Sequence, residues 1–242
     1  MKIGIDTGGT FTDLVATNQK SIFHIKVPST PKNPEQAIFE ALTILQKKSG
    51  ETIEQADVRH GTTVATNALL EQTGANLVLI TNRHLEDIFF LRRQARDELY
   101  ALHPQNPSHI LKRENILGIG GRINPQGEII ITLEELNAWN TRNGPVLSRA
   151  EAISICLLHS YVNSTHEKEI KSFLEKIYPQ KFITVSSELA PLEREYERTT
   201  TVVANGYVAP MMEKYMDNLC TELKKSSLSI MGSAGGLLPV SR

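Results

Sequence analysis

The sequence has 242 residues, with 26 basic and 27 acidic side chains and 40% hydrophobic residues. A chain of this length can bury a core without disulfides or metals, and its ordinary hydrophobic and charged fractions exclude a disordered or collagen-like protein. The formal charge of −1 argues against binding to nucleic acid or to an anionic membrane, so small molecules and other proteins are the expected partners.

The first residues and the cysteines favour the cytoplasm. Met1 to Asp6 contain no basic segment followed by an apolar one, so we expect no signal peptide. The most apolar run, Ala152 to Leu158, is too short to cross a bilayer. Cys156 lies in this run and Cys220 in a helical stretch, and both are expected to be buried thiols in a reducing compartment.

The first part of the chain predicts strands followed by a helix. Three short β-branched runs with turn-length gaps predict an antiparallel meander: Lys2 to Ile5, Leu14 to Thr17 and Ser21 to Val27. A helix follows, which Asn33 begins with capping-box spacing to Gln36 and which Gly50 ends. Val58 then leads into Gly61-Thr62-Thr63 and a helical segment that stops at Gly74.

The remainder alternates between buried strands and helices, which predicts an α/β chain with mixed strand order. The strands are expected at Asn76 to Thr81, Ala152 to Leu158, Phe182 to Ser186 and Ser229 to Met231. Capping boxes at Thr132 with Glu135 and at Ser164 with Glu167 predict two helix starts. Pro191 to Lys225 is helical, with a break or kink at Pro210. Gly118 to Gly121 is expected to be a turn, and Trp139 to be packed.

The strongest local signal is the octapeptide from Asp6 to Asp13, DTGGTFTD, directly after the first strand. Adjacent glycines can present backbone N–H groups to an anion, and Thr10 and Thr12 add hydroxyl donors. Asp6 is placed to hold a hydrated Mg²⁺. The segment is neither a dinucleotide fingerprint nor a Walker loop. A plain Gly-Gly hairpin turn is the alternative to a phosphate cradle.

The octapeptide resembles the first phosphate loop of the acetate kinase, sugar kinase, Hsp70 and actin superfamily. In detail it resembles the N-terminal region of the hydantoinase A, 5-oxoprolinase and acetone carboxylase β-subunit family. The resemblance continues in order through Lys26 to Pro31, His60 to Asn67, Arg93 to Arg96, Glu195 to Thr199 and Asn205 to Pro210. It implies a ribonuclease H-like ATPase domain of the actin and Hsp70 type, with a mixed sheet and an inserted α/β subdomain.

The same resemblance implies the function and its cofactors. Relatives use ATP with Mg²⁺ to activate a lactam or hydantoin carbonyl by phosphorylation, together with a hydantoinase B-like subunit. An acetone carboxylase-like, ATP-dependent carboxylase and a non-catalytic interaction module are the alternatives. The sequence departs from the family at His84-Leu85, where relatives carry Gly-Phe, and at Arg92, where they usually carry Gly. The substrate is therefore the least transferable property.

The resemblance also implies domain limits. Residues 1–225 would form the N-terminal domain, with a first ATPase lobe from Met1 to about Thr81 and the inserted subdomain and long helices after it. Residues 226–242 would begin a second ATPase domain whose remainder is missing, so we expect the isolated chain to be inactive and to bind ATP weakly or not at all.

The candidate site residues follow from the matched motifs. The resemblance gives catalytic roles to Asp6, Thr63, Asn67 and Arg93, nucleotide binding to Gly8, Gly9, Thr10, Thr12 and Asp13, substrate binding to His60, Gly61, Thr62, Arg96 and Arg198, and the metal to Asp6. By themselves, His60 to Thr63 fit either an anion site at a helix start or a Thr-capped helix. Arg92, Arg93 and Arg96 on one helix face fit an anion grip or a solvated face. Glu195 and Arg198 could simply pair.

Overall fold

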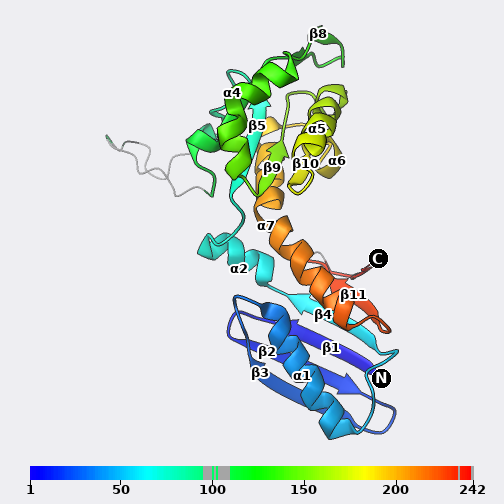
Figure 1. The fold of residues 1–242 in the computed structure, drawn as a ribbon. Coiled ribbons are helices and arrows are strands. Elements are labelled where there is room, and N and C mark those ends of the chain that lie inside the picture. The colour runs from blue at the N-terminus through cyan, green and yellow to red at the C-terminus, as the bar shows by residue number, and fades with distance from the viewer. Residues whose placement is uncertain (95–99, 101, 103–109, 234, 241–242) are drawn as a thin grey trace. The chain divides into compact units, whose positions relative to one another are not determined.

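The computed structural model describes residues 1–94, 100, 102, 110–233 and 235–240. The chain forms two compact units, which are Met1–Glu71 together with Met211–Arg242, and Gln72–Pro210. The second unit is therefore inserted into the first along the sequence. Figure 1 shows the elements of both units.

The first unit is built on a six-stranded sheet with the order β12-β11-β4-β1-β2-β3. Its strands are β1 (Lys2–Thr7), β2 (Phe11–Thr17), β3 (Ile22–Pro28), β4 (Asp57–Thr62), β11 (Ser227–Met231) and β12 (Leu237–Pro239). β1, β2 and β3 form the predicted antiparallel meander, whereas β4 pairs with β1, and β11 with β4, in parallel. The sheet is therefore mixed, as expected.

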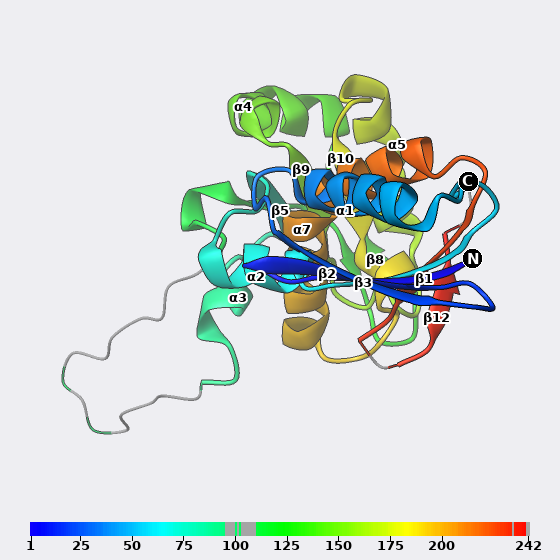
Figure 2. The same ribbon diagram turned by 90° about the horizontal axis from the view of Figure 1, so that it is seen from below.

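Side-chain alternation gives this sheet one buried and one open face. In β1, Ile3, Ile5 and Thr7 are buried, whereas the residues between them are exposed. Helix α1 (Pro34–Ser49) lies over the buried face (Figure 2). Its predicted apolar stripe is buried there: Ala37, Ile38, Ala41, Leu42 and Leu45. The C-terminal part of α7 (Glu195–Glu222) adds Tyr215 and Leu219 to the same core.

The ends of α1 confirm one expectation and correct another. Gly50 ends the helix with a left-handed φ of 69°, as predicted. The Asn33 side chain makes no capping hydrogen bond, because the Gln36 N–H donates to the Asn33 carbonyl at 3.0 Å. The predicted capping box is therefore not formed. Helix α2 (Val64–Glu71) follows β4 directly.

The second unit contains a fully parallel four-stranded sheet with the order β10-β9-β5-β6. Its strands are β5 (Leu77–Asn82), β6 (Ile116–Ile119), β9 (Ala152–Ile155) and β10 (Phe182–Val185), and a small sheet pairs β7 (Arg122–Ile123) with β8 (Ile129–Ile131). Every residue of β5 is buried, which confirms the predicted parallel strand. Gly118 and Ile119 belong to β6, so the turn predicted from Gly118 to Gly121 begins later than expected.

The helices of the second unit are α3 (Ile88–Leu91), α4 (Leu136–Arg149), α5 (Thr165–Ile177), α6 (Ser186–Leu189), the 3-10 helix η1 (Arg113–Asn115) and the N-terminal part of α7. Helix α7 is unbroken at Pro210. A Cβ atom on Gly206 would lie 2.3 Å from the Ser154 hydroxyl oxygen, so only glycine allows α7 to approach β9 this closely. No helix in the described ranges has both the length and the apolarity needed to cross a membrane.

Both capping boxes predicted in this unit are wrong. Glu135 itself caps α4, because its carboxylate accepts hydrogen bonds from the N–H groups of Asn137 and Ala138. Ser164 makes no capping hydrogen bond, and Glu167 is fully buried instead. The Glu167 carboxylate accepts from the Leu157 N–H at 2.8 Å and from the Ser186 hydroxyl at 2.6 Å. Glu167 therefore binds groups outside α5 instead of capping this helix, the role that its spacing from Ser164 predicts.

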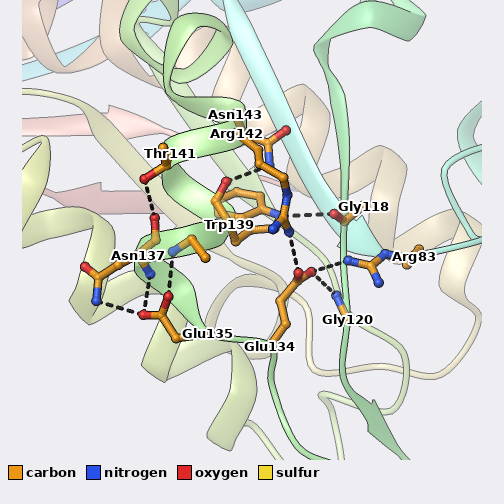
Figure 3. A network of polar contacts seen from close by, with 11 residues as sticks. Arg83, Gly118, Gly120, Glu134, Glu135, Asn137, Trp139, Thr141, Arg142 and Asn143 are labelled. Carbon is orange, nitrogen blue, oxygen red and sulfur yellow. Dashed lines mark hydrogen bonds and ion pairs between the residues drawn. The ribbon is translucent and has the colours of Figure 1, made fainter.

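Glu134 connects the start of α4 to the end of β6 (Figure 3). Its carboxylate accepts from the Gly120 N–H at 2.7 Å, from Arg83 at 2.6 Å and from Arg142 at 2.5 Å. Next to it, the Trp139 indole N–H donates to the Gly118 carbonyl at 3.0 Å, and this ring is 1% exposed. Trp139 is therefore packed, as predicted.

The unit boundaries differ from the domain limits expected from the sequence. β5 lies in the second unit, although we expected the first lobe to reach about Thr81. β11 and β12 extend the sheet of the first unit. The assignment of residues 226–242 to the start of a second ATPase domain stays a prediction.

Glu134→Gln should lower the free energy of unfolding of the second unit by about 1–2 kcal/mol at neutral pH, because it removes a carboxylate shared by two arginines and a backbone N–H. Burial opposes ionisation of Glu134, but Gly120, Arg142 and Arg83 outweigh it and hold its pKa below the ordinary value. This stabilisation is therefore present above the ordinary glutamate pKa and is lost as the pH falls through the lowered one. Urea unfolding can be followed by Trp139, the only tryptophan in the sequence.

Glu188→Gln is the matched control in the same unit. It breaks the pair between Lys171 and Glu188, whose carboxylate is 51% exposed, so the expected loss is at most about 0.5 kcal/mol. Equal losses in the two variants would contradict the special role of Glu134.

Candidate functional site

The turn that joins β1 to β2 presents backbone N–H donors. The Gly8 N–H closes the turn on the Phe11 carbonyl at 3.1 Å. Ser29, the residue after β3, stabilises the turn: its N–H donates to the Thr10 carbonyl at 2.9 Å and its hydroxyl donates to the Gly8 carbonyl at 2.8 Å. Among the described residues, no group accepts from the N–H of Gly9 or Thr10. These two donors are available to an anion.

Space, and not backbone conformation, favours glycine at position 9 of this turn. Neither Gly8 nor Gly9 has a positive φ, so other residues could adopt their backbone angles. A Cβ atom on Gly9 would lie only 3.2 Å from the Asn67 amide nitrogen. The absence of a side chain at Gly9 thus lets Asn67 of α2 approach the turn.

A row of residues crosses four strands on the open face. The strand register places Asp6 opposite Asp13 on one side and opposite Gly61 on the other, and Asp13 opposite Lys26. Lys26 donates to the Asp13 carboxylate at 2.8 Å, and the His24 ring lies 3.3 Å from it. The hydrogen bond from Lys26 outweighs slight burial and, with His24, lowers the pKa of Asp13. Asp13 is thereby neutralised locally.

Asp6 differs from Asp13 in having no such partner. Its carboxylate is exposed and, within the part of the chain that the structure describes, makes no hydrogen bond or ion pair. The cross-strand neighbour of Asp6 is Gly61, which has no side chain. A Cβ atom on Gly61 would lie 3.5 Å from the Asp6 carboxylate. Asp6 is therefore the carboxylate of this face that can receive a cation.

The donor set fits Mg²⁺ bound through phosphates and water. Mg²⁺ usually keeps several waters and takes one or two protein carboxylates beside substrate phosphates. The described residues contain no cluster of three or more His, Cys, Asp or Glu side chains suited to a metal. Asp6 beside backbone N–H donors fits the way in which Mg²⁺ binds one carboxylate together with substrate phosphates.

The β4–α2 segment ties the second part of the site to β1. Thr63 donates to the Thr7 carbonyl through its N–H at 3.2 Å and its hydroxyl at 3.4 Å. The Thr62 hydroxyl accepts from the Val64 N–H at 3.2 Å, at the first residue of α2. The Asn67 amide donates to the Thr63 hydroxyl at 3.4 Å. Thr63 and Asn67 are thus brought to the turn, whereas Thr62 stabilises the helix.

The structure places two predicted site residues in the core. Thr12 is fully buried, and its hydroxyl bonds the Ser29 hydroxyl at 3.0 Å, so it does not join Thr10 in one concavity as expected. His60 is 1% exposed, with its Nε2 atom 2.6 Å from the Tyr215 hydroxyl and its Nδ1 atom 3.4 Å from the Ile5 carbonyl. Strand alternation sends both side chains to the face opposite Asp6.

Burial sets the ionisation of the His60–Tyr215 pair. It lowers the pKa of His60 to about 4, against the hydrogen bond that the ring donates to the Ile5 carbonyl and the charge of Asp6. It also raises the pKa of Tyr215 to about 12, although the hydroxyls of Thr7 and Thr62 nearby act in the opposite direction. The imidazole is therefore neutral, and Tyr215 can donate to it.

The remaining predicted residues belong to the second unit. Helix α3 ends at Leu91 and Arg92 has a φ of 56°, so Arg92 and Arg93 lie after the helix and not on one of its faces. Arg93 pairs with Glu197, and both line a cavity of about 450 Å³ with Arg92 and Arg194. Arg96 lies outside the described residues.

Arg198 is almost fully buried, so it does not form the surface pair with Glu195 that the spacing allows. It is 2% exposed and donates to the carbonyls of Leu192 and Leu157.

Ser29 and Tyr215 are positioning residues that sequence reasoning did not single out. Ser29 lies in the matched segment from Lys26 to Pro31, which was the available signal. Tyr215 lies 155 residues from His60, and no local pattern connects the two.

Comparisons with known proteins identify what this chain is similar to. Residues 2–178 match the family described as the hydantoinase/oxoprolinase N-terminal region. An uncharacterized protein of Methanocaldococcus jannaschii is 34% identical over 98% of this chain and 36% of its own length. The caprolactamase subunit alpha of Pseudomonas jessenii is 32% identical over 98% of this chain and 36% of its own length. The 5-oxoprolinase 1 of Arabidopsis thaliana is 28% identical over 100% of this chain and 22% of its own length.

Solved structures agree with the fold. The crystal structure of the ATP-dependent caprolactamase from Pseudomonas jessenii superimposes with a TM-score of 0.85 and 30% identity over 98% of this chain and 36% of that one. Nucleotide-free acetone carboxylase superimposes with a TM-score of 0.83 and 24% identity over 100% of this chain and 37% of that one. The expected ATPase-type fold with a mixed sheet is confirmed. The chain spans about a third of the length of the first curated relatives it matches.

The free energy of unfolding should fall as the pH drops from about 6.5 to about 4, because the unfolded chain binds a proton at residue 60 that the native state excludes. The stabilisation is thus complete above the ordinary histidine pKa and is lost progressively as the pH falls toward about 4. Between about pH 7 and pH 5 the difference attributable to His60 should be about 2 kcal/mol. Urea unfolding followed by far-UV circular dichroism measures it as the difference between the wild type and His60→Gln. Parallel pH profiles for the two proteins would contradict a buried, neutral His60.

Proposed function

The chain belongs to the hydantoinase/oxoprolinase N-terminal family, and on that premise we propose that it is the ATPase-type part of an ATP-dependent cyclic amide hydrolase. The proposed substrate is a lactam or hydantoin, whose carbonyl is activated by phosphorylation. The name of the caprolactamase relative supports a lactam in particular.

The proposal rests on one observation: a carboxylate, two backbone N–H donors and an amide side chain lie together at one end of the first unit's sheet. Asp6, next to the last residue of β1, has a carboxylate without a partner among the described residues. Gly9 and Thr10 offer two N–H donors without acceptors in the same part of the chain, and Asn67 adjoins Gly9. A plain hairpin turn would require neither the Asn67 approach nor the open position at Gly61. This combination supports one half of a Mg-nucleotide site.

Each residue has a stated task in the proposed site. The N–H groups of Gly9 and Thr10 bind phosphate oxygens, and Asp6 holds Mg²⁺ through water. Thr63 and Asn67 orient the reacting side, and Ser29 keeps the turn in place. Bound ATP would supply the phosphoryl group that turns an amide oxygen into a better leaving group. Positioning and charge neutralisation are the main contributions a protein makes to such a transfer.

The whole protein's activity is proposed to need further parts. The relatives are about three times longer than this chain, and caprolactamase is named by subunit. We therefore place the chain in an assembly with a second ATPase half, which residues 226–242 begin, and a hydantoinase B-like subunit. Alone, the chain should bind ATP weakly or not at all. Cys156 and Cys220 are not joined in a disulfide, and we place the protein in a reducing, cytoplasmic setting.

Asp6→Asn should lower ATP-dependent lactam hydrolysis by the assembled enzyme about 100-fold or more, because the charge that holds Mg²⁺ is lost. Steady-state kinetics with ADP release as the readout measures it. The variant should unfold within about 0.5 kcal/mol of the wild type, since Asp6 is exposed and unpaired.

Asp13→Asn is the matched comparison, because Asp13 is the cross-strand neighbour of Asp6 on the same face. The resemblance gives Asp13 a nucleotide-binding role, whereas its carboxylate already pairs with basic side chains. Its partners are Lys26 and His24, so its effect on the rate should be less than about tenfold. Retained activity in Asp6→Asn, or ATP-dependent carboxylation without amide hydrolysis, would refute the proposed function.

Gly9→Ala should raise the KM for ATP about tenfold, because the added Cβ atom meets the Asn67 amide at 3.2 Å and displaces it from the turn. Gly4→Ala is the control in the same strand pair, where a Cβ would lie at an ordinary 3.8 Å from the Val15 carbonyl. Initial rates as a function of ATP concentration separate the two variants. The same KM in both would argue against a nucleotide at this turn.

A further inference from the structure

Arg198 is a buried cation without a carboxylate partner. Its Nη1 atom donates to the Leu192 carbonyl at 3.0 Å and its Nη2 atom to the Leu157 carbonyl at 2.6 Å. Its guanidinium also lies 5.2 Å from the centre of the Tyr161 ring. The buried Nε atom has no hydrogen-bond partner among the described residues, and no acid in that part of the chain pairs with this side chain.

Such an arrangement is costly unless an anion completes it. Arginine stays protonated at any ordinary pH, so it cannot escape burial by losing its charge. Two carbonyl oxygens and one aromatic face solvate part of the guanidinium, but they carry no full negative charge. Of its five N–H bonds, two donate to Leu192 and Leu157, and the Cys156 thiol lies near the same side chain. The Nε–H has no acceptor among the described residues, and it is one of the two N–H groups with which an arginine holds an oxyanion side-on.

Arg198 also lines a cavity of about 370 Å³, within the range of small-molecule sites. Leu157 follows β9, and Leu192 follows β10 and α6, so the guanidinium lies at the carboxyl end of these parallel strands. Ligands of open parallel sheets bind at this edge, where strands that are neighbours in space lead to opposite sides of the sheet. In the order β10-β9-β5-β6, the chain leaves β5 toward β6 and later returns to the other side at β9.

The loop after β9 carries a second group without a partner. His159 has a φ of 59°, which is unusual for a residue other than glycine, and its buried Nδ1 atom has no partner among the described residues. Its ring lies edge-on to Tyr161, the same ring that Arg198 stacks on. Burial lowers the pKa of His159, and the charges of Arg122 and Arg198 add to this effect against Glu195.

We propose that Arg198 binds the carboxylate of a small organic acid in this cavity. The other charges on its wall are those of Glu193, Arg194 and Glu197, which bring the lining to zero net charge with Arg198 included. A single negative charge suits such a wall better than a phosphate dianion, which the two glutamates would repel. This site lies within the second unit and does not depend on the proposed nucleotide site of the first.

Acetate titration of the ¹⁵N-labelled 242-residue chain tests the proposal directly. The arginine Nε–H resonances are followed by NMR while sodium acetate replaces sodium chloride at constant ionic strength. The Arg198 resonance should shift and saturate, whereas that of Arg59, which is exposed and paired with Asp57, should not. If acetate produces no saturable shift at Arg198, the arginine only supports the two carbonyls and the proposal fails. This measurement uses the wild type, so it needs no variant to fold.

Two variants and one competing ion sharpen the result. Arg198→Lys should weaken acetate binding about tenfold or more, because a lysine cannot keep both carbonyl contacts and the side-on anion. Arg194→Gln is the matched control on the same wall and should change affinity less than about threefold. The reverse order would overturn the assignment to Arg198. Inorganic phosphate should bind more weakly than acetate, and tighter phosphate binding would overturn the carboxylate assignment.

Discussion

The parallel pairing of β1 with β4 is the constraint from which the first site follows. Its register sets Ile5 beside His60 and Asp6 beside Gly61. Because neighbouring side chains alternate between faces, the former pair enters the core and the latter reaches solvent. A slip of one residue would exchange the two faces, burying a carboxylate and exposing an imidazole. The bond between His60 and Tyr215 inside the core therefore stabilises the register that makes Asp6 available.

Local patterns were sufficient where one segment determines its own structure. The β1–β2 hairpin, the apolar stripe of α1 and the fully buried β5 could all be predicted, because periodicity and turn chemistry decide them. The direction of the Thr12 and His60 side chains depends on strand phase relative to a distant helix, which spacing cannot reveal. The capping boxes failed for a related reason. Glu167 has the spacing of a cap, but buried donors from β9 and α6 compete for it and win.

The two units offer two different electrostatic environments. The first unit exposes a carboxylate and backbone donors in water, where single interactions are weak and a covering surface would strengthen them. The second unit buries a guanidinium, where an incoming anion meets a low dielectric and gains more from each contact. Gly9 and Gly206 serve these environments in a similar way, since each lets another element approach where a methyl group would collide.

The insertion of the second unit into the first has a consequence for the order of folding. Residues 72–210 are continuous in sequence, so this unit can fold as soon as it has been synthesised. The sheet of the first unit gains β11 only after that, because β11 must pair with β4 from the far side of the insertion. A folded insertion shortens the effective loop between these strands and lowers the entropic cost of closing it. Mutations that slow the folding of the second unit should thus leave the edge of β4 unpaired on the nascent chain. Because an unpaired strand edge promotes aggregation, folding of the inserted unit influences the solubility of the whole polypeptide.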